Sequence, residues 1–169
     1  MLTEIGSCLA LYSQGATKAN AASVNQEQIM TFTVTTHLNF NGQARAALDF
    51  YVRVFDGEQV LMTYEAMGQA EVAAAPDNII WGQVISKEGF RIMAFDVRAG
   101  QEYNAGKNAF YVSLSGSSLE DNRARWSRLA EGATILQDLA PTQWSPLFGM
   151  LIDRFGITWV VDVATGATH

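Results

Sequence analysis

The chain has 169 residues, of which 49% are hydrophobic and 17% charged, and its formal net charge is −6. This balance is typical of a globular domain with a sizeable core. No cluster of Lys and Arg is present to follow a phosphate backbone, which argues against a nucleic-acid partner. No apolar run reaches the roughly 18–20 residues of a bilayer span, and the N-terminus lacks the basic region of a signal peptide. We expect a soluble, cytoplasmic protein with no membrane partner.

The first thirty residues differ in composition from the rest of the chain. Residues 14–28 are rich in Ala, Asn, Gln and Ser, and Met30 opens a stretch of strong β character. We interpret residues 1–30 as an N-terminal extension that packs on the domain or acts as a dimer arm; a start upstream of the usual Met30, or a non-native addition, are the alternatives. The single cysteine, Cys8, excludes an internal disulfide and suits a reducing compartment.

The first half of the remaining chain begins with a strand and a helix. Residues 31–40 alternate and are β-branched, which predicts a strand. Asn41 suits a helix N-cap, and Gly57 suits the C-cap. Between them, apolar side chains recur at helical spacing, at Ala44, Ala47, Leu48, Tyr51 and Phe55.

Three further strands complete this half, over residues 59–64, 79–85 and 90–97. Residues 66–78 are small, polar and closed by a Pro-Asp pair, which indicates a loop. The last two strands are joined by a turn that ends at Gly89.

The second half repeats this order. A strand is predicted over residues 109–115, and Ser118 with Asp121 resembles a capping box that opens a helix ending at Gly132. Its buried face would be formed by Leu119, Trp126, Leu129 and Ala130.

The chain then ends in strands over residues 133–139, 147–152 and 157–163. Each half therefore reads β-α-β-β-β and closes with a hairpin whose return strand ends in Asp-Val, at Asp96 and Asp162. We interpret these two acids as matching structural residues. The predicted fold is α/β (α+β), a single domain over 31–165 made of modules 31–104 and 105–165, with mixed sheets that form a cup and helices on the outer side.

The face of the first strand away from the helix carries polar side chains. Period-two alternation separates Thr35, His37 and Asn39 from Leu38 and Phe40. The apolar side is needed by the helix, so the polar side should face the cup. With a reference pKa of about 6.5, His37 is the candidate general base or ligand hydrogen-bonding group. The alternative is a strand histidine whose polar atoms are satisfied by a neighbour.

Apolar and amide side chains from other strands should line the same cup. Met93 and Phe95 share a strand face with Arg91, and Gln83 lies on the neighbouring strand. An apolar cup with a few polar groups suits an organic ligand; alternatively these side chains simply fill the core. From the second half we expect Ala109, Tyr111 and Val160 at the cup, with Trp144 as a lid between two prolines or as a cap on the core edge.

Several segments resemble one known family. These are Asn39 to Ala44, Ala47 to Phe55, Ile92 to Asp96, Trp144, and Phe148 to Trp159. Together they resemble PhnB-like proteins of the glyoxalase/bleomycin resistance protein/dioxygenase (vicinal oxygen chelate) superfamily, over residues 33–163. The resemblance implies paired βαβββ modules, commonly in a homodimer.

In the metal-dependent relatives, each of four strands supplies one ligand. Carried across by position, the resemblance places these sites near Thr35, Met93, Ala109 and Val160, none of which is His, Glu or Asp. Since the chain has only 2 histidines and a catalytic metal needs about three protein ligands, we expect no metal and no cofactor. Some members carry a ubiquinone-methyltransferase name, but no Gly-rich strand-to-helix turn supports a methyl-donor site.

The favoured hypothesis is a protein that binds a small organic molecule, by sequestration or sensing, as a homodimer. A metal-independent enzyme of the isomerase or lyase type with His37 as general base is the first alternative, and a structural or interaction module the second. The predicted ligand pocket comprises Thr35, His37, Asn39, Gln83, Met93, Phe95, Ala109, Tyr111, Trp144 and Val160.

Overall fold

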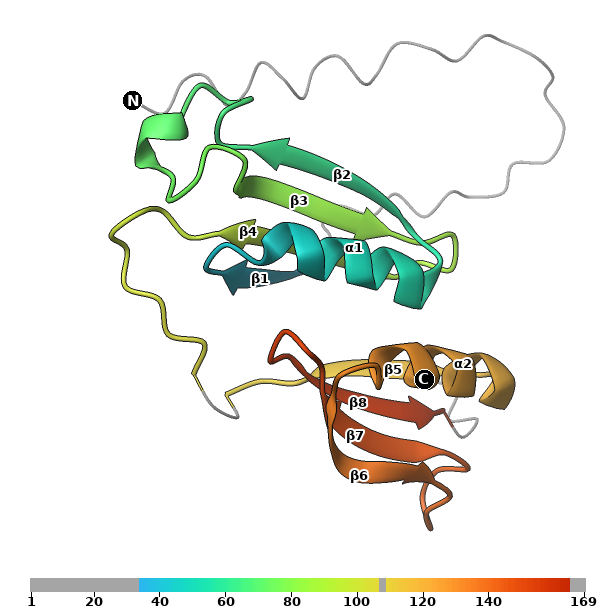
Figure 1. Ribbon diagram of the computed structural model, residues 1–169. Helices are drawn as coiled ribbons and strands as arrows, with labels where there is room; N and C mark the ends of the chain where they lie inside the picture. Colours follow the sequence, from blue (N-terminus) through green and yellow to red (C-terminus); the bar gives the residue numbers. More distant parts are fainter. Residues whose placement is uncertain (1–33, 107–108, 165–169) are drawn as a thin grey trace, which may run out of the picture. The chain divides into compact units, whose positions relative to one another are not determined.

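Two four-stranded mixed sheets, each with one α-helix, form the part of the chain that the computed structural model describes, residues 34–106 and 109–164 (Figure 1). The predicted N-terminal extension, residues 1–30, lies outside the described residues.

The first module has the strand order β1-β4-β3-β2. Its β1 runs parallel to β4, whereas the other neighbours are antiparallel. A single 3-10 turn, η2, interrupts the predicted loop after β2. The elements are β1 (Thr36–Phe40), α1 (Ala44–Phe55), β2 (Glu58–Thr63), η2 (Ala70–Val72), β3 (Ile79–Ile85) and β4 (Arg91–Asp96).

The second module has the equivalent order β5-β8-β7-β6, again with its first and last strands parallel. The elements are β5 (Val112–Gly116), α2 (Leu119–Leu129), β6 (Thr134–Ala140), β7 (Phe148–Ile152) and β8 (Thr158–Val163). The predicted tandem βαβββ fold is therefore confirmed, and in each module the parallel pair brings the first strand beside the last.

The N-terminus of α1 is held by a side chain from another strand. The prediction of Asn41 as N-cap is wrong: the N-cap is Gln43, whose side chain makes no capping bond. Instead the buried carboxylate of Asp96 accepts from the Ala44 N–H at 3.0 Å and from the Ile79 N–H at 2.9 Å. A carboxylate near the positive end of the helix dipole is favourable, so Asp96 fixes α1 and β3 to the end of β4.

The C-terminus of α1 also differs from the prediction. Asp56, with φ 48°, takes the left-handed C-cap conformation that was expected of Gly57. Gly57 is needed for space instead, because a Cβ there would lie 2.8 Å from the Val84 side chain and 3.0 Å from the Ile85 carbonyl oxygen. The short side chain of Asp tolerates the left-handed region, so the two roles fall on adjacent residues.

Helix α2 begins as predicted and packs Trp126, Leu129 and Ala130 on the core, but its first turn buries a different residue. The Ser118 hydroxyl accepts from the Asp121 N–H at 3.2 Å, which confirms the N-cap. Leu119, expected in the core, is 46% exposed, and the buried position in the first turn belongs to Asn122. The Asn122 amide donates to the Asp162 carbonyl at 2.6 Å. Gly116 provides the room, since a Cβ there would lie 2.3 Å from Asn122 Oδ1.

The two Asp-Val strand ends are not equivalent. Asp96 pairs with Phe40 and is 1% exposed on the helix-covered side, whereas Asp162 pairs with Ser115 on the opposite side of its sheet. The prediction that they match is wrong, because Asp162 lies one residue away from the position equivalent to Asp96. Since successive side chains point to opposite faces of a strand, Asp162 faces away from the helix and bonds the Ser115 hydroxyl, whereas Asp96 bonds a helix N-terminus.

The modules are joined through the buried carboxylate of Asp153, in the turn after β7. Oδ2 accepts from the Tyr51 hydroxyl of α1 at 2.8 Å and from the Trp159 indole at 2.9 Å. Oδ1 accepts from the Phe155 and Ile157 N–H groups of its own turn, at 2.9 Å and 3.0 Å. The aromatic rings of Tyr51, Phe155 and Trp159 pack around it.

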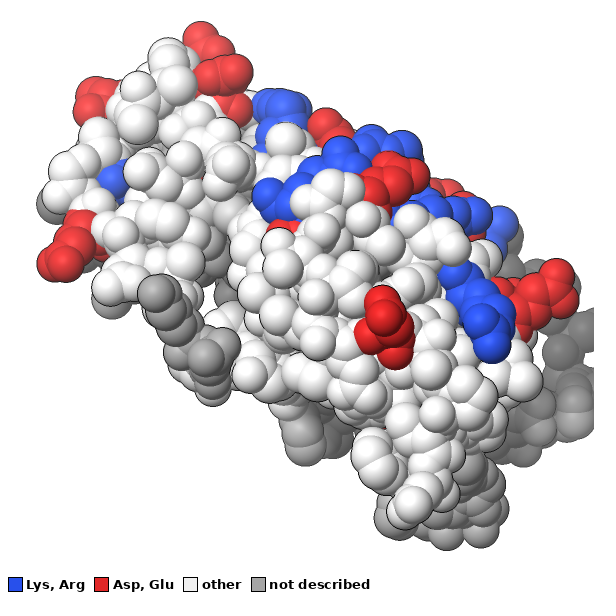
Figure 2. Space-filling view, turned by 60° about the horizontal axis from the view of Figure 1, so that its bottom comes forward, with Lys and Arg blue, Asp and Glu red and all other residues white. Residues whose placement is uncertain are grey.

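Charged side chains also join the modules at the surface. Arg128 of α2 donates to the Arg53 and Val54 carbonyls at the end of α1 and pairs with Asp56, while Arg125 pairs with Glu88. In Figure 2 the Lys and Arg side chains lie among Asp and Glu, with no large patch of one sign on the face shown. No helix among the described residues is long and apolar enough to cross a membrane.

Replacing Tyr51 by Phe should lower the free energy of unfolding by about 1.5–3 kcal/mol, because Asp153 loses one of its donors while remaining charged and buried. Urea unfolding measures this. Tyr111→Phe is the matched control, since Tyr111 is 43% exposed and should change stability by less than about 0.5 kcal/mol. Equal effects of the two substitutions would contradict the role given to Tyr51.

Stability should also fall at alkaline pH in a manner that depends on Tyr51. Burial, followed by the charge and hydrogen bond of Asp153, raises the pKa of Tyr51 well above its ordinary value. The unfolded chain releases this proton near pH 10, but the folded chain retains it. The Tyr51 contribution is therefore complete below about pH 10 and is lost as the pH rises further. Tyr51→Phe should show a flatter decline of unfolding free energy in this range.

Candidate ligand site

One face of the first sheet is covered by α1, and no other described helix covers the opposite face. On the covered side, Leu48 of α1 packs so closely on Gly82 that a Cβ there would lie 2.3 Å from its side chain. Leu38 and Phe40 of β1 also lie on this side and are each 1% exposed. We call the opposite side the open face. In β1 it carries His37 and Asn39, both exposed, as alternation predicted.

The strand register brings the candidate residues of the first module together on the open face. His37 pairs with Met93, Met93 with Gln83, and Gln83 with Val60. Directly paired residues project to the same side of a sheet. We call this set of four the central row; Met93 and Gln83 are half-buried, and Val60 is 56% exposed.

Aromatic side chains lie beside the central row. Asn39 pairs with Phe95, and Trp81 pairs with Met62 on the same face. The His37 ring meets the edge of the Phe95 ring, with 5.1 Å between centroids. Sequence alternation identified Phe95, but it did not single out Trp81, Val60 or Met62.

The imidazole of His37 is a neutral polar group at pH 7. Partial burial lowers the pKa of His37 from its ordinary value of 6.5, because desolvation disfavours the charged form. No described residue makes a hydrogen bond to its side chain within the ranges 34–106 and 109–164. The ring can therefore donate through one nitrogen and accept through the other, and none of the described residues fixes which nitrogen does which.

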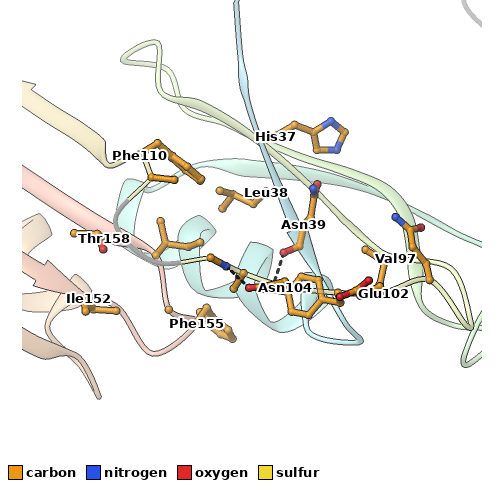
Figure 3. A pocket seen from close by; sticks show the side chains of 17 residues that line it. His37, Leu38, Asn39, Val97, Glu102, Asn104, Phe110, Ile152, Phe155 and Thr158 are labelled. Carbon is orange, nitrogen blue, oxygen red and sulfur yellow. Dashed lines mark hydrogen bonds between the residues drawn. The ribbon is translucent and has the colours of Figure 1, made fainter.

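A cavity of about 500 Å³ lies next to the same strand (Figure 3). His37 and Asn39 form one wall, and the opposite walls come from the turn at Phe155 and from the segment after β4. Tyr103 of that segment donates to the Asn39 carbonyl at 3.0 Å. No periodicity of the sequence assigned Tyr103 or the segment around it to a site.

The remaining predicted residues are distributed differently. Ala109 lines the cavity with His37 and Asn39. Val160 lies on the uncovered face of the second sheet, paired with Ser113 and Met150. Tyr111 precedes β5, and Trp144 is 64% exposed in its loop.

Trp144 contacts Phe148 edge-on, with 5.8 Å between ring centroids. Thr35 lies just before β1. Of the ten predicted pocket residues, direct strand pairing therefore gathers five: His37, Asn39, Gln83, Met93 and Phe95.

The four positions at which the resemblance implied metal-ligand sites, Thr35, Met93, Ala109 and Val160, carry no metal-binding side chains. Pairing places His37, rather than Thr35, beside Met93, and Ser113, rather than Ala109, beside Val160. Across the part of the chain that the structure describes, no three His, Cys, Asp or Glu side chains gather. Since protein metal sites need several such donors, we assign no metal-dependent step.

Comparison with known proteins matches this arrangement to a family. A family model described as 3-demethylubiquinone-9 3-methyltransferase matches residues 32–162. The chain belongs to this family. This family is the PhnB-like branch of the vicinal oxygen chelate superfamily. The match confirms that the segments between Asn39 and Trp159 resemble PhnB-like proteins.

Three relatives illustrate this PhnB-like membership. Protein YjdN from Escherichia coli (strain K12) is 24% identical over 143 residues, which cover 77% of this chain and 94% of YjdN. The structure of PA1353 from Pseudomonas aeruginosa has a TM-score of 0.70 and 28% identity, covering 79% of this chain and 98% of that one. A putative 3-demethylubiquinone-9 3-methyltransferase, PhnB protein, from Bacillus cereus has a TM-score of 0.65 and 25% identity, covering 79% and 100%.

The methyltransferase description implies a methyl donor, and the strand-to-helix turn where a nucleotide-type donor would bind does not fit one. Such cofactors bind at Gly-rich turns between a strand and an open helix N-terminus. The turn between β1 and α1 contains one glycine, Gly42, and the first amide of α1 is already bonded to the carboxylate of Asp96. The turn therefore lacks both the Gly-rich shape and the open helix N-terminus of such a site, so we derive no methyl-transfer step.

The pKa of His37, measured by NMR titration of its ring protons, should lie below about 6.5. The His37→Gln variant assigns the resonance. Removing the neighbouring ring in Phe95→Ala should raise the pKa toward its ordinary value, because water gains access to the imidazole. A His37 pKa that stays at or above 6.5 in the unchanged protein would contradict the desolvated position.

Proposed function

We propose that this PhnB-like protein binds a small organic molecule on the open face of its first sheet, over the central row. The observation that carries the proposal is the joint placement of a neutral imidazole, an amide and a thioether, from His37, Gln83 and Met93, on paired strands. Apolar surface with a few convergent polar groups is the usual character of an organic ligand site.

Each part of the face has a separate role in this proposal. Met93 and Phe95 supply apolar contact, and burying about 100 Å² of apolar surface contributes about 2.5 kcal/mol before the cost of association. His37 and Gln83 supply hydrogen bonds that orient the ligand, each contributing about 0.5–1.5 kcal/mol. The cavity beside Asn39 offers room for a larger substituent.

Binding without chemistry is the version that the geometry supports. A histidine general base is normally oriented by a third group that bonds its second nitrogen. In the described ranges, the ring that contacts His37 is that of Phe95, which has no hydrogen-bonding group to orient the imidazole. We therefore propose sequestration or sensing of the ligand, and the role of His37 is that of a hydrogen-bonding group.

A neutral two-ring aromatic, 2-naphthamide, should raise the melting temperature in a thermal-shift titration. At ten times the dissociation constant, mass action stabilises the folded state by about 1.4 kcal/mol, or about 3–5 °C for a protein of this size. His37→Ala and Met93→Ala should each weaken binding by about five- to tenfold, because each removes a contact from the central row.

Leu136→Ala is the matched control for this titration. Leu136 is 51% exposed on β6, outside the proposed site, so its truncation should leave the affinity unchanged. If 2-naphthamide and related neutral aromatics bind with no effect of the His37 and Met93 substitutions, the site lies elsewhere. If none of them shifts the melting temperature, the binding proposal fails.

A further inference from the structure

A positively charged side chain stands at one end of the open face of the first sheet. Arg91 begins β4, two residues before Met93, and is exposed. It pairs with Ile85, which in turn pairs with Glu58. Since residues two apart on a strand share a face, Arg91 lies on the same side as the central row.

Arg91 has no ion-pair partner within the described residues. The salt bridges there join Arg125 to Glu88, Arg128 to Asp56 and Arg154 to Glu131. The acid in the same row, Glu58, lies two strands away, about 10 Å at the usual strand spacing. The guanidinium therefore keeps its five donors available toward the open face.

The second module shows that the fold does not require this charge. Met93 corresponds to Val160, because each pairs with the first strand and with the third strand of its own sheet. By the same pairing Arg91 corresponds to Thr158, and His37 corresponds to Ser113. An otherwise equivalent sheet forms with neutral hydroxyl groups at both places, so the cation and the imidazole are particular to the first sheet.

We propose that the ligand of this site is an aromatic carboxylate, whose ring lies over Met93 and Phe95 and whose anionic group is bound by Arg91. This inference rests on the proposed function and names its ligand class. A planar guanidinium matches a carboxylate through two parallel hydrogen bonds.

The spacing of the two polar ends fits such a molecule. Arg91 lies two residues along β4 from Met93, and His37 lies beside Met93 on the next strand. The Cα atoms of Arg91 and His37 are therefore about 8 Å apart. A one- or two-ring acid spans a gap of this order once the two side chains reach toward it. His37 and Gln83 then contact the end of the ligand opposite the carboxylate.

The test compares 2-naphthoate with its neutral amide, 2-naphthamide, by NMR or calorimetric titration of the full chain at low salt. The unchanged protein should bind the acid about fivefold more tightly than the amide, a ratio typical of an exposed charge-assisted contact. Arg91→Gln should reduce the ratio to about one, because it weakens binding of the acid more than binding of the amide. Added salt should reduce the ratio in the unchanged protein, because exposed charges are screened.

Two further variants separate Arg91 from net charge. Arg123→Gln removes the same charge from an exposed position on α2 and should leave the ratio at about five. Glu58→Gln, which removes the acid in the same row, should keep or increase it.

The role of Arg91 would be overturned if the unchanged protein bound acid and amide equally, or if the Arg91→Gln protein kept the preference for the acid. Either result would leave the binding proposal standing. Failure of both probes to bind would overturn the proposed function, and this inference with it.

Discussion

The buried carboxylate of Asp153 holds the two modules together. All of its acceptor capacity is used, by two N–H groups of its own turn, the indole of Trp159 and the hydroxyl of Tyr51 from the other module. A buried charge is tolerated only when it is satisfied in this way. The position of the turn after β7 against α1 is thus fixed by polar geometry as well as by aromatic packing, and this turn forms one wall of the cavity beside His37 and Asn39.

The two modules have the same topology but carry different side chains on the faces that their helices leave open. Both sheets place their first strand parallel to their last, and both cover one face with a helix. The covered faces are constrained by close packing, as the contacts of Gly82 with Leu48 and of Gly149 with Trp126 show. Among the described residues, no helix packs against the opposite faces. There the first sheet carries His37, Gln83 and Arg91, while the second carries Ser113, Met150 and Thr158, which is why the ligand proposal concerns the first sheet.

Errors in the sequence predictions arose where a long-range partner replaced a local one. Asn41 is a favourable N-cap by type, but Asp96, distant in sequence, bonds the first amide of α1. Leu119 fitted the helical spacing of a core residue, yet the space beneath α2 is taken by Asn122 and Gly116. The match of Asp96 with Asp162 followed a repeated dipeptide, whereas strand pairing shows that the two lie on opposite faces.

The sequence by itself determined the order of strands and helices, the division into two similar modules, and which side of β1 is polar, because each of these follows from local periodicity and turn residues. It also carried the segments by which the family is recognised. Only the tertiary structure decided which strands pair and in what register. That register sets His37 beside Met93 and Gln83 and places Arg91 at the end of the same face, and the packing of the modules brings Tyr51 to Asp153. These placements depend on contacts between residues far apart in the chain, for which a single sequence contains no periodic signal.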